Sequence, residues 1–196
     1  MPQPPILPLI DWSAVFAGGL AWRPWLDTAT RPEQRTELLG SYGGFHPLPE
    51  GVARLAALTR PVHMVVIAEA WCGDVRRQVP VLQKLADAST GRVEVRYITR
   101  AAHLDIFARF LTNGGEAIPK GIFLSADWVE TGHWGPMPAA ARRVIARGKA
   151  ANDIAGARKQ VAALYAADPH RRETEAEVLE AVELAATPAV LAEAKG

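Results

Sequence analysis

The segment VVIAEAWCGDVRRQVPVLQKLA, residues 65–86, gives the strongest indication of the architecture. Its β-branched start continues the apolar run PVHMVVIAEA (Pro61–Ala70), which has the length of a strand and the composition of one buried on both faces. From Gly73 to about Gly91 the apolar residues instead recur with helical spacing. Cys72, the only cysteine of the chain, lies where the predicted strand becomes the predicted helix.

The rest of the chain also divides into short elements. Between Asp11 and about Thr59 the pattern is helical but interrupted by turn residues. After the central segment we expect a strand at 92–99, a helix at 101–111 that stops at TNGG, strands at 118–125 and 129–134 joined by a tight turn, a long helix at 135–167, and a last helix at 173–186. No internal repeat interrupts this order.

Strands that alternate with helices predict an α/β fold. We expect a mixed sheet of about four strands flanked by helices, with a parallel first pair joined by a right-handed crossover and a closing antiparallel hairpin. Residues 61–150 are expected to form the core. Residues 1–60 form a mainly helical N-terminal extension packed on that core, and residues 151–196 form a C-terminal helical extension.

Composition excludes several classes of protein. The 196 residues carry a net charge of +1 with scattered basic residues, which argues against a nucleic-acid partner. No apolar run reaches the roughly 18 residues of a membrane span, and the start MPQPPILPLIDW lacks the features of a secretory signal. A single cysteine excludes an intramolecular disulfide. We therefore expect a cytoplasmic protein without a membrane partner.

The position of Cys72 favours a reactive thiol. Backbone N–H groups and the positive end of the helix dipole lower the pKa of a thiol at a helix N-terminus. Arg76 and Arg77, one turn into the helix, would favour the thiolate further, whereas Asp74 would oppose it. The alternative interpretation is a small buried hydrophobe, and the sequence leaves the choice open.

Other reactive sites have less support. The phosphate-binding loop of cysteine phosphatases and arsenate reductases needs an arginine six residues after the cysteine, and that residue here is Gln78. His103 and His133 have no spaced partner, so we expect no metal site. Asn113 and Lys120 could line a small-molecule groove or be ordinary solvated side chains.

The segment WCGDVRRQVPVLQKLA resembles the active-site segment of the thioredoxin superfamily, including a proline, Pro80, inside the helix. AIPK places Ile118 and Pro119 where that superfamily has its cis-proline, and WCGD, LTNGGEAIPK and WGPMP together resemble a poorly characterised bacterial thioredoxin-like subfamily. The resemblance implies a thioredoxin-like fold with Cys72 as the nucleophile. It also implies a substrate ledge formed by Ile118 and Pro119.

The remaining candidate residues are assigned around that nucleophile. The amides of Gly73 and Asp74 are expected to stabilise the thiolate, and Arg76 or Arg77 to assist electrostatically. Trp71 is a candidate flat surface for substrates, although a half-buried packing role fits a tryptophan equally well.

Two departures from the superfamily pattern decide the kind of reaction to expect. Val75 stands in place of the second cysteine and Val66 in place of a buried acid. The resemblance then implies thiol–disulfide exchange by one cysteine, with glutathione or a bacillithiol-like thiol as co-substrate and no resident cofactor. Partners would be disulfide-bearing or thiol-modified proteins, or a small thiol.

Other readings stay open at this point. The cysteine could form a sulfenate in a sensing or peroxidase-like role. The groove could also serve a non-catalytic binding module. Glutathione-transferase-like conjugation ranks third, because the appended helices look too short for that family's helical domain. A homodimer through the appended helices is also open.

Overall fold

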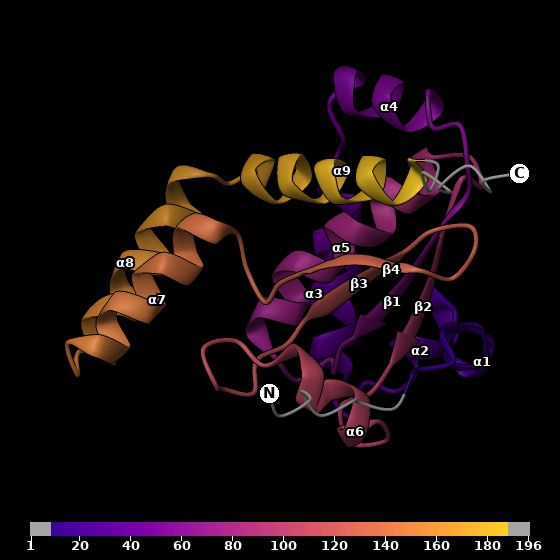
Figure 1. The fold of residues 1–196 in the computed structure, drawn as a ribbon. Coiled ribbons are helices and arrows are strands. Elements are labelled where there is room, and N and C mark those ends of the chain that lie inside the picture. Colours follow the sequence, from indigo (N-terminus) through magenta and orange to yellow (C-terminus); the bar gives the residue numbers. More distant parts are fainter. Residues whose placement is uncertain (1–8, 188–196) are drawn as a thin grey trace, which may run out of the picture.

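The computed structural model describes residues 9–187, and its centre is a four-stranded mixed sheet with the strand order β2-β1-β3-β4 (Figure 1). The strands are β1 (Val62–Ile67), β2 (Val93–Ile98), β3 (Lys120–Leu124) and β4 (Glu130–Trp134). β1 pairs in parallel with β2, while β3 pairs antiparallel with both β1 and β4. The predicted mixed sheet flanked by helices is confirmed, as are the helical extensions at both ends.

The central strand β1 shows why the apolar run is continuous. It has a strand on each side, and all of its residues except His63 are buried. Helix α5 (Gly73–Ala88) then carries the chain across the sheet to β2, which is the predicted crossover. The turn after α5 needs positive φ angles at Thr90 and Gly91, which ends the helix.

The N-terminal extension consists of four helices, α1 (Trp12–Gly18), α2 (Trp22–Leu26), α3 (Pro32–Gly43) and α4 (Pro49–Ala56). Asp11 caps α1 by accepting a hydrogen bond from the backbone N–H of Ala14 at 2.9 Å. The indole of Trp25 is fully buried, stacks on Tyr97 of β2 and donates to the carbonyl oxygen of Ala68. The extension is therefore part of the main hydrophobic core.

The segment after the sheet corrects one prediction, because the single long helix at 135–167 is wrong. The chain forms two helices, α7 (Ala139–Ala150) and α8 (Ile154–Ala167). Asn152 has a φ of 54°, and Asp153 caps α8 by accepting from the N–H of Gly156 at 2.8 Å. These two residues reverse the chain. The resulting pair projects away from the sheet (Figure 1).

The last described helix returns to the sheet. α9 (Arg172–Ala186) crosses it and buries Val178 and Val182 in the main core (Figure 1). The predicted helix at 101–111 is shorter than expected, namely α6 (Leu104–Phe107) followed by a 3-10 turn. No helix among residues 9–187 is both long and apolar enough to cross a membrane. The division into 1–60, 61–150 and 151–196 stays a prediction.

Candidate thiol site

Cys72 lies at the N-terminus of α5, directly after the sheet, and its side chain is partly exposed. The Sγ atom donates a hydrogen bond to the carbonyl oxygen of Ile118 at 3.5 Å. The Ile118–Pro119 peptide bond is cis. The structure thus brings the candidate nucleophile and the candidate substrate ledge side by side. Gly73, the first residue of α5, is exposed and has open space where a side chain would stand.

The environment of Cys72 raises the pKa of its thiol. Burial is the largest cause, and the carboxylate of Asp74 adds to it by repulsion. Hydrogen bonds from the backbone N–H groups of Val75 and Asp74 lower the pKa, and Arg76 lowers it less. The net direction is opposite to the one expected from the helix N-terminus alone. The favourable amides are those of Val75 and Asp74, and Gly73 is not among them.

Arg76 is held by the backbone and by the N-terminal extension. Its guanidinium donates to the carbonyl oxygens of Ala70 at 3.1 Å and Trp71 at 2.6 Å. Its Nε atom lies 2.5 Å from a carboxylate oxygen of Glu37 in α3. A charge paired in this way is partly neutralised, which explains why Arg76 contributes little to the thiolate.

Arg77 contacts the C-terminal extension instead of the thiol. Its guanidinium donates to the carbonyl oxygens of Tyr165 at 3.2 Å and Asp168 at 2.8 Å, and lies 4.2 Å from the centre of the Tyr165 ring. The Tyr165 hydroxyl in turn donates to Asp74 at 3.0 Å. Burial raises the pKa of Asp74. Tyr165 is a site residue that sequence reasoning missed, because no local signal connects it to residues about ninety positions earlier.

Trp71 forms an exposed flat surface beside the thiol. Its side chain is 52% exposed, and its indole N–H donates to Glu69 at 3.0 Å. The guanidinium of Arg100 lies 5.9 Å from the centre of its ring. About half of Trp71 is therefore open to contact a bound molecule, while its other half is covered, so the alternative packing role stays open.

Two groups of a dithiol site are replaced by apolar side chains. Val75 and Val66, at the positions of the second cysteine and of the buried acid, are both fully buried. Cys72 is the only cysteine of the sequence, so no second thiol takes the place of the one at Val75. Across residues 9–187, no group of three His, Cys, Asp or Glu side chains could hold a metal ion.

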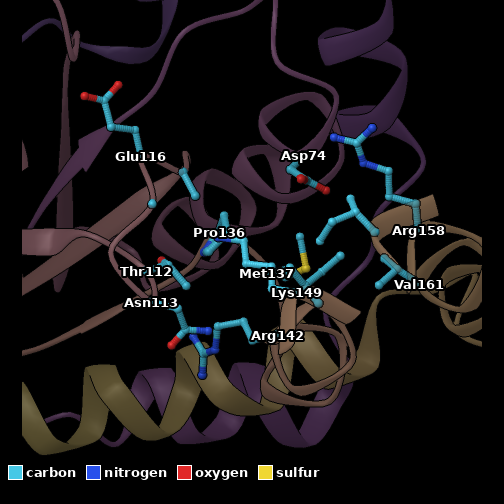
Figure 2. A pocket seen from close by; sticks show the side chains of 14 residues that line it. Asp74, Thr112, Asn113, Glu116, Pro136, Met137, Arg142, Lys149, Arg158 and Val161 are labelled. Atoms are coloured by element: carbon cyan, nitrogen blue, oxygen red, sulfur yellow. The ribbon is translucent and has the colours of Figure 1, made fainter. Parts of the chain in front are cut away.

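A cavity of about 330 Å³ lies between this site and the α7–α8 pair (Figure 2). Asp74 lines it from α5 and Ala117 lines it from the segment before the ledge. Arg142 and Lys149 of α7 and Arg158 of α8 bring positive charge to its wall. We call it the arm cavity, because the projecting α7–α8 pair closes one side of it.

The chain is similar to known proteins mainly in its fold. No curated protein matches it. A protein of unknown function from Pseudomonas aeruginosa has a similar structure, with a TM-score of 0.70 at 17% identity, over 89% of this chain and 98% of that one. An HIV epitope scaffold also has a TM-score of 0.70, at 16% identity and the same coverage. The family model described as Thioredoxin matches residues 20–152, more than half of the chain. The chain therefore belongs to this thioredoxin family.

Proposed function

We propose that the protein is a thiol–disulfide oxidoreductase that uses one cysteine and an external thiol. The observation that carries the proposal is the contact between Cys72 Sγ and the Ile118 carbonyl oxygen beside the cis Pro119. A substrate peptide in extended conformation could pair with the backbone of this ledge as an added strand. A sulfur atom of that peptide would then lie within reach of Cys72. The exposed ring of Trp71 offers apolar contact next to the thiol.

The reaction balances with one protein thiol. The Cys72 thiolate attacks a mixed disulfide between a target protein and a small thiol, forming a bond to the small thiol's sulfur and releasing the target as its thiolate. A second small thiolate then attacks the small thiol's sulfur in the new disulfide. Cys72 leaves as a thiolate, and the two small thiols depart joined as a disulfide. No resident cofactor takes part in these two steps.

The raised pKa of Cys72 makes this exchange dependent on pH. Only the thiolate attacks, so the rate is expected to rise as the pH increases beyond the ordinary range for a cysteine. A less acidic thiol is also the more nucleophilic one once ionised, which partly offsets its small thiolate fraction at neutral pH.

The arm cavity supports a small thiol with carboxylate groups as the co-substrate. Glutathione is of this kind. Arg142, Lys149 and Arg158 outnumber the acidic side chains of the wall, Asp74 and Glu116. Because Asp74 and Ala117 lie within two residues of Cys72 and Ile118, a molecule in the cavity borders the ledge.

Trapping experiments test the proposal. We expect folded protein to form a one-to-one adduct with oxidised glutathione, detected by mass, at a rate that rises with pH, and Cys72→Ser to form none. Reduced glutathione should then release the adduct. A thiol that stays inert to both glutathione disulfide and iodoacetamide until the protein unfolds would contradict the proposal. The groove would then be that of a non-catalytic binding module.

A further inference from the structure

Lys120, the first residue of β3, is an unusual buried charge. Its side chain is 2% exposed, and its ammonium donates to the hydroxyl of Thr112 and to the carbonyl oxygen of Gly135, the latter at 3.1 Å. An ammonium has three donors, so these two bonds leave one donor over. Among the described residues no carboxylate lies within ion-pair distance of Lys120. A buried charge without a counter-ion is costly, which calls for an explanation.

Lys120 lies in the wall of a second cavity, of about 440 Å³, which we call the basic cavity. Arg142 and Arg143 of α7 and His133 of β4 line it together with Asn113. None of its lining residues is acidic. The cavity therefore gathers cations and hydrogen-bond donors around one space.

In the basic cavity, about two positive elementary charges have no acidic partner. Arg142 has a carboxylate of Glu177 at 3.9 Å and donates to the carbonyl oxygen of Gly135. Arg143 and Lys120 have no such acid among residues 9–187. A dianion would balance these two charges. The ammonium, the guanidinium groups and the amide of Asn113 supply the donors that phosphate oxygens accept.

We propose that the basic cavity binds the phosphate group of a small molecule. Its polar wall is separate from the thiol of Cys72, so the inference does not rest on the proposed redox function. Thr112, Asn113 and Arg142 line both this cavity and the arm cavity, whose wall also contains the apolar Met137 and Val161 (Figure 2). The rest of a phosphorylated molecule can therefore lie against α7 and α8 while its phosphate faces Lys120.

An NMR titration of the full chain tests the site. Inorganic phosphate at pH 7, with potassium chloride at equal ionic strength as the reference, is expected to shift the backbone amides of Asn113 and Gly135 in a saturable way. Arg143→Gln should weaken this binding by about tenfold, since it removes a charged hydrogen-bond donor. Arg147→Gln is the matched control, because Arg147 lies one turn further along α7, is exposed and lines neither cavity.

The outcomes separate the possibilities. Tighter binding of glycerol 3-phosphate than of phosphate assigns the site to a phosphate ester, and the reverse order assigns it to free phosphate. The site is refuted if potassium chloride alone gives the same shifts, if acetate binds as tightly as phosphate, or if Arg147→Gln weakens binding as much as Arg143→Gln. Lys120→Met is expected to weaken binding further than Arg143→Gln, and a folded Lys120→Met protein that keeps full affinity would also overturn the proposal.

Discussion

At the scale of the single residue, the thiol shows how local signals and burial compete. Backbone amides at the helix N-terminus lower the pKa of Cys72, but they are those of Val75 and Asp74, whereas the sequence predicts those of Gly73 and Asp74. Burial outweighs them, and the carboxylate of Asp74 adds to burial. How deeply the Cys72 sulfur is buried depends on how the ledge at Ile118 packs against it. That packing joins segments far apart in the chain, so the residues next to Cys72 in the sequence do not determine it.

Replacing Asp74 tests this balance. Asp74→Asn removes the negative charge but keeps an oxygen that can accept from the Tyr165 hydroxyl. We expect the pKa of Cys72 to fall and alkylation by iodoacetamide at pH 7 to become at least about threefold faster, because full screening by water gives the smallest effect and both groups are partly buried. Glu116→Gln is the control, because Glu116 lines the same cavity but does not act on the thiol. Equal rates for wild type and Asp74→Asn would show that the charge of Asp74 does not contribute to the pKa of Cys72.

The buried ammonium of Lys120 leads to a second prediction at the residue scale, on how the free energy of unfolding changes with pH. Burial and Arg142 lower its pKa from 10.5 to about 8. The unfolded chain then binds more protons than the folded one between these two values, so the free energy of unfolding gains a term that increases from about pH 8 to about pH 10.5. Below that window the fold holds a charged ammonium at a cost in free energy, which the rise in stability with pH removes.

Urea unfolding at pH 7.5 and pH 10.5 measures how the contribution of Lys120 to the free energy of unfolding changes with pH. Because tyrosines also titrate near the upper end, the quantity to follow is the difference between wild type and Lys120→Met. Wild type is expected to gain stability relative to the variant as the pH rises. A difference that stays constant across the two pH values would mean that Lys120 keeps an ordinary pKa. Phosphate should reduce the effect if it binds beside the protonated ammonium.

At the scale of the element, periodicity predicted most helices and strands but missed two chain reversals. The alanine-rich stretch around Asn152 and Asp153 reads as continuous helix, because alanine favours helix and the reversal depends on two polar residues. TNGG was predicted only to stop a helix. Asn113 and Gly114 both have positive φ, and Thr112 and Gly115 exchange both backbone hydrogen bonds, so this is a two-residue turn of the Asn-Gly type.

Gly148 fixes the spacing of the α7–α8 pair. A Cβ atom there would lie 2.3 Å from the Cβ of Ala157 and 2.9 Å from the carbonyl oxygen of Asp153. Gly148→Ala is expected to lower the free energy of unfolding by about 1–3 kcal/mol, since the two helices must separate. Gly40→Ala in α3 is the matched control, because nothing lies within 4 Å of its Cβ position. That substitution should stabilise by about 0.5–1 kcal/mol.

The denaturant midpoints of the two variants test whether α7 and α8 pack as closely as the structure shows. Opposite signs for Gly148→Ala and Gly40→Ala support close packing of α7 on α8. A stabilised Gly148→Ala protein would show that the pair tolerates a wider spacing. The arm cavity would then adapt in shape as well.

At the scale of the whole molecule, both extensions are attached to the helix that carries the thiol. Arg76 contacts Glu37 of the N-terminal extension, and Arg77 contacts the C-terminal one. The sequence predicted these arginines from their spacing to Cys72 and assigned them to the thiolate. Their actual partners lie far away in the chain. Only the three-dimensional packing determines such pairs, so the fold of the sheet and the contact between Cys72 and Ile118 could be predicted, while the partners of the two arginines could not.

The buried bond between α9 and α5 tests whether core and extension unfold together. Thr174 and Gln78 are 1% and 0% exposed, and the Thr174 hydroxyl donates to the Gln78 amide oxygen at 2.8 Å. Thr174→Val keeps the shape but removes the donor, which should cost about 1–2 kcal/mol. Thr36→Val, whose exposed hydroxyl donates only to Pro32 within α3, should change stability by less than about 0.5 kcal/mol.

Two probes followed through the same urea titration give the answer. Far-UV circular dichroism reports all the helices, whereas tryptophan fluorescence reports mainly the N-terminal extension and the sheet, because no tryptophan lies beyond Trp134. We expect Thr174→Val to move both transitions to lower urea by the same amount, since Val178 and Val182 of α9 belong to the main core. The indole of Trp134 donates to Glu177 of α9 at 2.7 Å, so detachment of α9 alone would change only the part of the fluorescence that comes from Trp134. An earlier circular dichroism transition accompanied by only this partial fluorescence change would mean that α9 detaches first, and that the thiol helix α5 is stable without it.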